Sequence, residues 1–131
     1  MDLGSVALAG GFLKPAGFKN EKYYPLRLFY CEQCYGLQVV DKVDSVELFE
    51  DYFYFSSSIN TLMNHFKQYA GEVTSRFLRA PLRDAKVLEF GCNDGVLLRP
   101  LADLGIGTVI GVDPAANIIG TIDDSRIKII N

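Results

Sequence analysis

The most informative chemistry in the sequence lies in a short polar turn. Residues 89–95 read Glu-Phe-Gly-Cys-Asn-Asp-Gly, and they follow an apolar segment at 87–90 that is typical of a strand. A strand that ends in an acidic residue, followed by a glycine turn and a helix, offers a ligand bare backbone N–H groups and the positive end of a helix dipole. A second acidic residue, Asp113, ends the next β-branched segment at 108–112. The pattern predicts a site for an anionic or polar ligand.

The spacing of the glycines separates two ligand classes that use such a turn. A dinucleotide-binding turn would have glycines at 91, 93 and 96, where this chain has Gly91, Asn93 and Val96. Nicotinamide binding is therefore disfavoured. A structural alternative stays open, in which residues 91–95 are only a tight strand-to-helix turn and Asp113 is a helix N-cap.

The turn resembles the first motif of the S-adenosylmethionine-dependent methyltransferases, acid-x-Gly-x-Gly-x-Gly, with Asn93 at the middle glycine. In that family the turn lies under the methionine portion and the ribose of the cofactor, and the acid of the second strand hydrogen-bonds both ribose hydroxyls. The resemblance implies S-adenosylmethionine as the cofactor and the ribose role for Asp113, since a carboxylate accepts two hydroxyl donors well. The cofactor-binding residues that it implies are Glu89, Gly91, Cys92, Asn93, Asp94, Gly95, Asp113 and Pro114.

Nearly the whole chain is similar to one subfamily, the sugar C-methyltransferases with an N-terminal zinc-binding domain. The similarity rests on residues 89–98 and 111–115, and upstream on Tyr24-Pro25-Leu26, Cys31-x-x-Cys34, Leu37-Gln38, Leu48-Phe49, Tyr52-x-Tyr54-x-Ser56-Ser57 and His65. Members remove a proton beside the ketone of a nucleotide-linked 4-keto deoxysugar and methylate the resulting enolate. The resemblance implies this C-methylation, with a nucleotide-linked sugar as the small-molecule substrate.

Cys31 and Cys34 lie at the turn of a predicted β-hairpin formed by residues 26–30 and 37–40. A closed structural zinc site needs four ligands, so this pair is half a site. In the resembling family another Cys-x-x-Cys pair lies upstream, and this chain begins without it. Three interpretations stay open: a remnant knuckle without metal, a zinc site completed from elsewhere or by a second chain, and a redox pair or plain hairpin cysteines.

Residues 51–58 combine aromatic and hydroxyl side chains. One interpretation is a packed connection whose serines cap the following helix. The other is that the segment folds over the cofactor domain and presents a phenolic hydroxyl to the substrate, and the resemblance favours Tyr54 as the catalytic residue. A tyrosine there could hydrogen-bond the developing enolate oxygen or relay a proton. The family's main catalytic base would lie beyond Asn131.

The elements that position these residues follow from periodicity. Leu62, Phe66, Tyr69, Val73 and Phe77 form an apolar stripe that predicts an amphipathic helix over 60–79. Beyond a break at 81–86, strand and helix alternate up to a third strand at 127–130, which predicts a parallel sheet. The expected fold class is α/β, and its parts are a small Cys-containing β-hairpin and loop domain that binds zinc and covers the substrate (1–58), a linking helix (59–84) and the first half of a Rossmann-like class I methyltransferase sheet (85–131).

Charge and hydropathy narrow the classes of partner. The 131 residues carry a formal net charge of −3, so no basic field exists to hold a nucleic acid. The apolar runs are far shorter than the ~20 residues that span a bilayer. Residues 1–20 lack the features of a secretory signal, and three cysteines fit a reducing compartment better than a disulfide framework. We therefore expect a cytoplasmic protein without nucleic-acid or membrane partners.

Residues 85–131 leave room for only part of a methyltransferase sheet. We expect either an incomplete N-terminal portion of an enzyme or a homo-oligomer that pairs through the apolar edge at 127–130. The alternative hypothesis is a non-catalytic truncated paralogue or oligomerising module that retains part of the S-adenosylmethionine site. Binding of the cofactor separates the two hypotheses.

Overall fold

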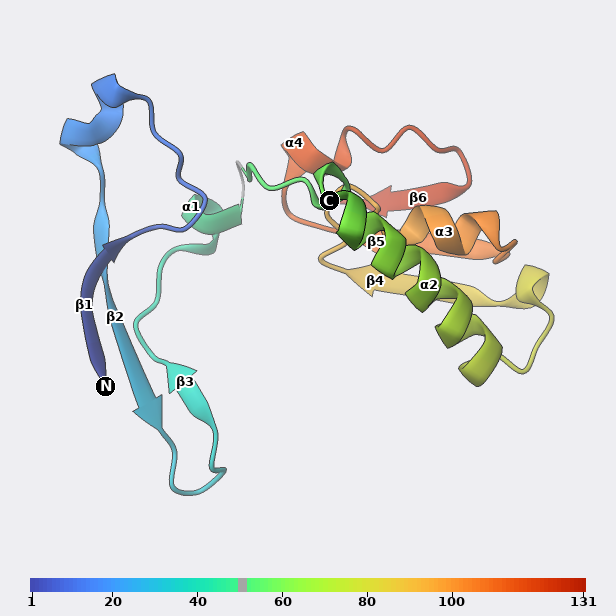
Figure 1. The fold of residues 1–131 in the computed structure, drawn as a ribbon, viewed down its shortest axis with the longest axis horizontal. Helices are drawn as coiled ribbons and strands as arrows, with labels where there is room; N and C mark the ends of the chain where they lie inside the picture. Colours follow the sequence, from blue (N-terminus) through green and yellow to red (C-terminus); the bar gives the residue numbers. More distant parts are fainter. Residues whose placement is uncertain (50–51) are drawn as a thin grey trace. The chain divides into compact units, whose positions relative to one another are not determined.

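The described residues form two three-stranded sheets, one antiparallel and one parallel (Figure 1). The structure is a computed structural model that describes residues 1–49 and 52–131. It divides into two units, Met1–Phe49 and Glu50–Asn131. The expected linking helix and the expected methyltransferase sheet both belong to the second unit.

The first unit contains the antiparallel sheet, in the order β1 (Asp2–Ala7), β2 (Tyr23–Tyr30) and β3 (Leu37–Val39). A 3-10 helix (Pro15–Asn20) connects β1 to β2, and the short helix α1 (Ser45–Phe49) ends the unit. The predicted hairpin is confirmed, since β2 and β3 pair antiparallel with Leu28 opposite Val39.

The second unit contains the parallel sheet, in the order β4 (Lys86–Phe90), β5 (Thr108–Val112) and β6 (Ile127–Ile130). Helix α3 (Leu98–Asp103) follows β4, and α4 (Ala116–Ile119) follows β5. The predicted α/β class and the parallel pairing are confirmed. Because the strands run in one direction, their carboxyl ends meet at one edge of the sheet, where α4 and the start of α2 also lie (Figure 1).

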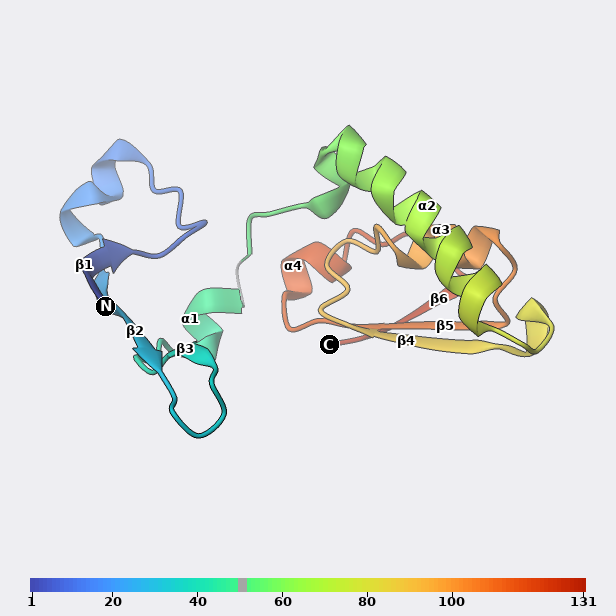
Figure 2. The same cartoon turned by 60° about the horizontal axis from the view of Figure 1, so that its bottom comes forward.

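Helix α2 (Asn60–Phe77) confirms the predicted long helix, and with α3 it lies on one side of the parallel sheet (Figure 2). The predicted apolar stripe is wrong in part, because Phe77 is 68% exposed and Tyr69 is exposed as well. The buried positions are the small residues Ala70 and Thr74. The Thr74 hydroxyl donates to the carbonyl of Ala70 at 2.8 Å, which lets a polar side chain enter the core.

Helix α3 begins at Leu98. Pro100 is therefore the third residue of the helix, where a backbone N–H has no partner within the helix in any case. The largest fully buried side chains are Leu98, Ile118, Val109, Asp94 and Cys92. Two of these five come from the polar turn, so the core reaches the predicted site. Within the described parts of the chain, no helix has the length and apolarity needed to cross a membrane.

Candidate functional site

The turn after β4 and the acid after β5 are joined at the carboxyl edge of the parallel sheet. The backbone N–H of Asn93 donates to Oδ2 of Asp113 at 2.8 Å, and the N–H of Ala115 donates to Oδ1 at 2.9 Å. Asp113 is only 8% exposed. Asp113 therefore holds the backbone on both sides of it, but the alternative in which it is a helix N-cap is wrong, since the residue preceding α4 is Ala115 and the described side chains make no cap bond there. A carboxylate with two such bonds still has lone pairs for a ligand.

The backbone of the turn is shaped for close approach by a ligand. Gly91 has φ +71° and Asn93 has φ +47°, a region that favours glycine and that asparagine tolerates better than most residues. No described atom outside its immediate neighbours lies within 4 Å of the position where a Cβ on Gly91 would be. The turn thus presents bare backbone on the exposed side of Gly91.

Two buried carboxylate oxygens of the site have no hydrogen-bond partner among the described residues: Oε2 of Glu89 and Oδ1 of Asp94. Burial, together with the nearby charge of Asp113, raises the pKa of Glu89 to about 7. Unpaired buried acceptors are costly, so a ligand that brings positive charge or hydroxyl donors would stabilise this site. S-adenosylmethionine carries both, and the residues present fit it in this respect.

Cys92 belongs to the turn, and its side chain is buried. Its side chain is 1% exposed, and burial with the neighbouring acidic groups raises the pKa of its thiol to about 11. A Cβ added to Gly111 would lie 2.7 Å from its Sγ and 2.5 Å from Leu98 Cδ1. The thiol therefore packs against a glycine of β5, and the backbone of Cys92 remains the part that belongs to the turn.

Residues 52–57, here called the covering segment, are attached to this turn. The Asn93 side chain accepts the N–H of Ser56 at 3.0 Å and donates to the carbonyl of Tyr54 at 2.8 Å. Oδ2 of Asp94 accepts the N–H of Ser57 at 3.0 Å. The structure thus brings the predicted aromatic and hydroxyl segment to the predicted cofactor residues; Asp51, with which the prediction begins, lies outside the described residues.

The side chains of the covering segment differ from one of the two sequence interpretations. Serine capping of the next helix is wrong, since the residue preceding α2 is Ile59 and no side chain among the described residues caps the helix. Ser58 instead donates its hydroxyl to the carbonyl of Phe55 at 2.7 Å. Tyr54 is 43% exposed and its ring lies edge-on to that of Tyr52, with 6.5 Å between ring centroids.

Sequence reasoning missed Asn117 in α4. Its side chain accepts the N–H of Tyr52 at 3.4 Å and donates to the carbonyl of Tyr52 at 2.8 Å. The available signal was its place in the first turn of a helix that follows Asp113. Pro114, a predicted cofactor residue, is exposed, and its carbonyl accepts the Asn131 side-chain amide at 3.1 Å.

Cys31 and Cys34 lie in the loop that joins β2 to β3. Backbone N–H groups of Cys34 and Gln33 and the Cys34 side chain hydrogen-bond the Cys31 sulfur and lower its pKa, which favours the thiolate that a metal requires. Tyr35 donates its N–H to the Cys31 carbonyl at 2.8 Å and has φ +59°, which closes the turn. Among the residues that the structure describes, no three His, Cys, Asp or Glu side chains gather as a metal site.

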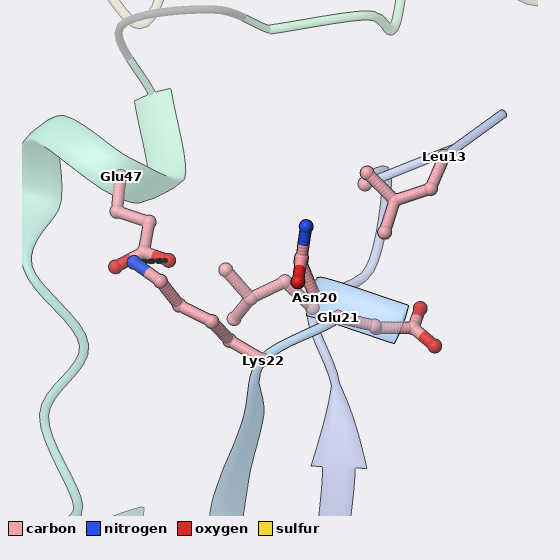
Figure 3. Close-up of a pocket in the computed structure, with 7 residues that line it drawn as sticks. Leu13, Asn20, Glu21, Lys22 and Glu47 are labelled. Atoms are coloured by element: carbon pink, nitrogen blue, oxygen red, sulfur yellow. Dashed lines mark ion pairs between the residues drawn. The ribbon is translucent and has the colours of Figure 1, made fainter. Parts of the chain in front are cut away.

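A cavity of about 270 Å³ lies elsewhere in the first unit. Lys22 and Glu47, which line it, form an ion pair of 2.9 Å (Figure 3). Glu47 also accepts a hydrogen bond from Tyr24, and both bonds lower its pKa. Because the cation is already neutralised by its neighbour, the cavity offers no unpaired charge for a ligand from this pair.

Comparison with known proteins matches both parts of the chain. Residues 1–49 match the family described as "Putative zinc binding domain", and residues 63–129 match the family described as "Methyltransferase domain". The chain is 30% identical over 134 residues to the C-methyltransferase NovU of Streptomyces niveus. That alignment covers 99% of this chain and 30% of NovU, so the chain spans about a third of the length of this relative.

Proposed function

Since the chain belongs to the methyltransferase family, we propose that its second unit binds S-adenosylmethionine at the turn after β4 and serves methyl transfer to a carbon atom. The observation that carries the proposal is the pair of buried oxygens on Glu89 and Asp94 that no described residue hydrogen-bonds, beside the open backbone of Gly91. When bound, the cofactor supplies an electrophilic methyl group on a positively charged sulfur.

Each site residue has a distinct task in this proposal. Glu89, as a carboxylate, pairs with the cationic amino-acid end of the cofactor, and Asp113 accepts ribose hydroxyls through the lone pairs that its two backbone bonds leave over. The N–H of Asn93 holds Asp113 in orientation before any ligand binds. Such prior ordering lowers the entropic cost of binding.

The acceptor of the methyl group is proposed to be a nucleotide-linked keto sugar, which reacts at the carbon beside its ketone. The similarity to the C-methyltransferase NovU supports C-methylation, and the resemblance of the tyrosine-serine segment to the sugar C-methyltransferases supports the sugar. Tyr54 stands on the covering segment with its side chain partly exposed. Its hydroxyl would donate to the substrate oxygen on which negative charge develops, because a phenol is a better donor than base at neutral pH.

In the first unit, Cys31 and Cys34 are proposed as two ligands of a zinc ion. The lowered pKa of Cys31 and the match to a zinc-binding family support this role. Two thiolates are half of a tetrahedral set, so other ligands must complete the site. Elemental analysis of the purified chain and of Cys31→Ser tests it: loss of bound zinc in the variant is expected, and equal zinc in both would contradict the assignment.

Isothermal titration of the chain with S-adenosylmethionine tests the main proposal. Saturable binding is expected in the chain and in Asp123→Ala, which removes an exposed acid. Asp113→Ala should abolish binding. No binding to the folded parent chain would overturn the proposal and favour the alternative of a non-catalytic module.

A further inference from the structure

Side-chain amides form hydrogen bonds with the backbone of the covering segment, as a neighbouring strand does in a sheet. Asn117 binds both the N–H and the carbonyl of Tyr52, while Asn93 binds the carbonyl of Tyr54 and the N–H of Ser56. Each amide thus supplies one acceptor and one donor to the same stretch of backbone, as a peptide group of an adjacent strand would. Two separate residues, far apart in sequence, act on one segment in the same way.

The two asparagines follow two neighbouring strands of the parallel sheet. Asn93 belongs to the turn after β4, and Asn117 belongs to α4, which follows the acid at the end of β5. Ligands of open parallel sheets bind at this carboxyl edge. A segment that is bound at both places therefore runs along the edge where the cofactor is proposed to bind.

The backbone of Asn93 does not explain why an asparagine stands there. Its φ of +47° is one that glycine adopts without strain. Glycine has no side chain with which to bind Tyr54 and Ser56. What asparagine adds at position 93 is therefore the attachment of the covering segment.

We propose that Asn93 and Asn117 are positioning residues that hold the covering segment across the cofactor site and so retain bound S-adenosylmethionine. The inference rests on the proposed function and extends it to residues that act through the segment. Asp94 adds a third attachment through the N–H of Ser57. Release of the cofactor then requires the segment to detach, and loss of either amide speeds that step.

The test uses the whole chain with the variants Asn93→Gly and Asn117→Ala. Asn93→Gly keeps the positive φ and removes only the amide, so the turn survives. Asn117→Ala removes the second amide from a different element and decides the question if the first variant fails to fold. Asn64→Ala, at an exposed position of α2, is the matched control.

Three readouts separate positioning from general stability: thermal melting, amide hydrogen exchange of residues 52–58 by mass spectrometry, and the dissociation rate of S-adenosylmethionine by stopped flow. We expect exchange of these residues to rise about tenfold in both variants. Cofactor dissociation should be about five- to tenfold faster, as expected for the loss of one or two hydrogen bonds. The exchange of β4–β6 and the behaviour of Asn64→Ala should match the parent chain.

The possible results are distinct. Binding by the parent chain with unchanged dissociation or unchanged exchange in both variants would overturn the inference and leave the proposed function standing. Absence of binding by the folded parent chain would overturn the proposed function and the inference with it. Faster dissociation together with faster exchange confined to residues 52–58 would support the inference.

Discussion

The backbone N–H of Asn93 donates to Oδ2 of Asp113 at 2.8 Å, which joins the turn after one strand to the acid that ends the next. The same carboxylate accepts the N–H of Ala115 through its other oxygen. A single side chain therefore orders both halves of the proposed site. We therefore expect its removal to affect folding as well as binding.

Asp113→Ala should destabilise the second unit because it leaves two N–H groups without their acceptor. Each bond to a charged acceptor contributes about 1.5–3 kcal/mol. Asp113→Asn keeps one side-chain oxygen, so its free energy of unfolding should lie between those of Asp113→Ala and the parent chain. Urea unfolding measures the stability of each variant, with Asp123→Ala as the control for the loss of charge. An Asp113→Ala variant as stable as this control would contradict the structural role of Asp113.

The raised pKa of Glu89 predicts a pH dependence of stability. The folded chain keeps this proton up to about pH 7, whereas an ordinary glutamate releases it near 4.5. The folded state therefore binds more protons than the unfolded state in this window, and stability falls as pH rises through it. Glu89→Gln should show a shallower decline between pH 4.5 and 7 in urea unfolding; parallel curves for the two proteins would count against it.

The same group predicts a proton linkage for cofactor binding. A cation that pairs with ionised Glu89 must displace its proton below pH 7, so affinity should rise with pH towards 7, by at most about tenfold per pH unit. Calorimetry in buffers of different ionisation enthalpy would detect the released proton. Glu89→Gln should bind more weakly and release none from this group.

Gly111→Ala should destabilise the chain, because its Cβ would lie 2.5 Å from Leu98 Cδ1 and 2.7 Å from Cys92 Sγ. Overpacking of this kind costs about 1–3 kcal/mol. The control is Gly71→Ala in α2, where a Cβ meets no described atom within 4 Å and alanine should gain about 0.5–1 kcal/mol. Chemical unfolding should give opposite signs for the two variants, and equal effects would show that the packing is looser than described.

The three cysteines should differ sharply in alkylation. Cys34 is exposed and Cys31 is partly exposed with a lowered pKa, whereas Cys92 is buried with a pKa near 11. At pH 8 about one Cys92 thiol in a thousand is ionised. After treatment with a chelator, iodoacetamide followed by mass spectrometry should modify Cys31 and Cys34 first, and Cys92 only in denaturant. Rapid labelling of native Cys92 would contradict its burial.

The sequence predicts the sheet of the second unit well because its strands are local, β-branched runs. Residues 108–112 and 127–130 are strands as expected. The buried face of α2 is less predictable, since periodicity identifies apolar residues but not the small ones, Ala70 and Thr74, that allow close packing. The start of α3 depends on how a turn places Pro100, which a helical pattern does not encode.

The candidate site, too, was predictable from the sequence only in part. The motif points to the residues of the turn and to Asp113, and the structure brings them together. The attachment of the covering segment could not be predicted, because the bonds from Asn93 and Asn117 join residues 37 to 65 positions apart and end on backbone atoms. A hydrogen bond that ends on a backbone atom does not require a particular residue type at the partner position, so the sequence does not reveal it.

These hydrogen bonds to the backbone fix the number of residues between the attachment points. The Asn117 side chain hydrogen-bonds the backbone of Tyr52, and the Asn93 side chain hydrogen-bonds the backbone of Tyr54 and Ser56. The identity of the exposed Phe53 between them is free to vary, but the number of residues is not. One inserted residue advances an extended chain by about 3.3 Å, more than a hydrogen bond can absorb. Related sequences should therefore tolerate substitutions in this stretch and reject insertions or deletions.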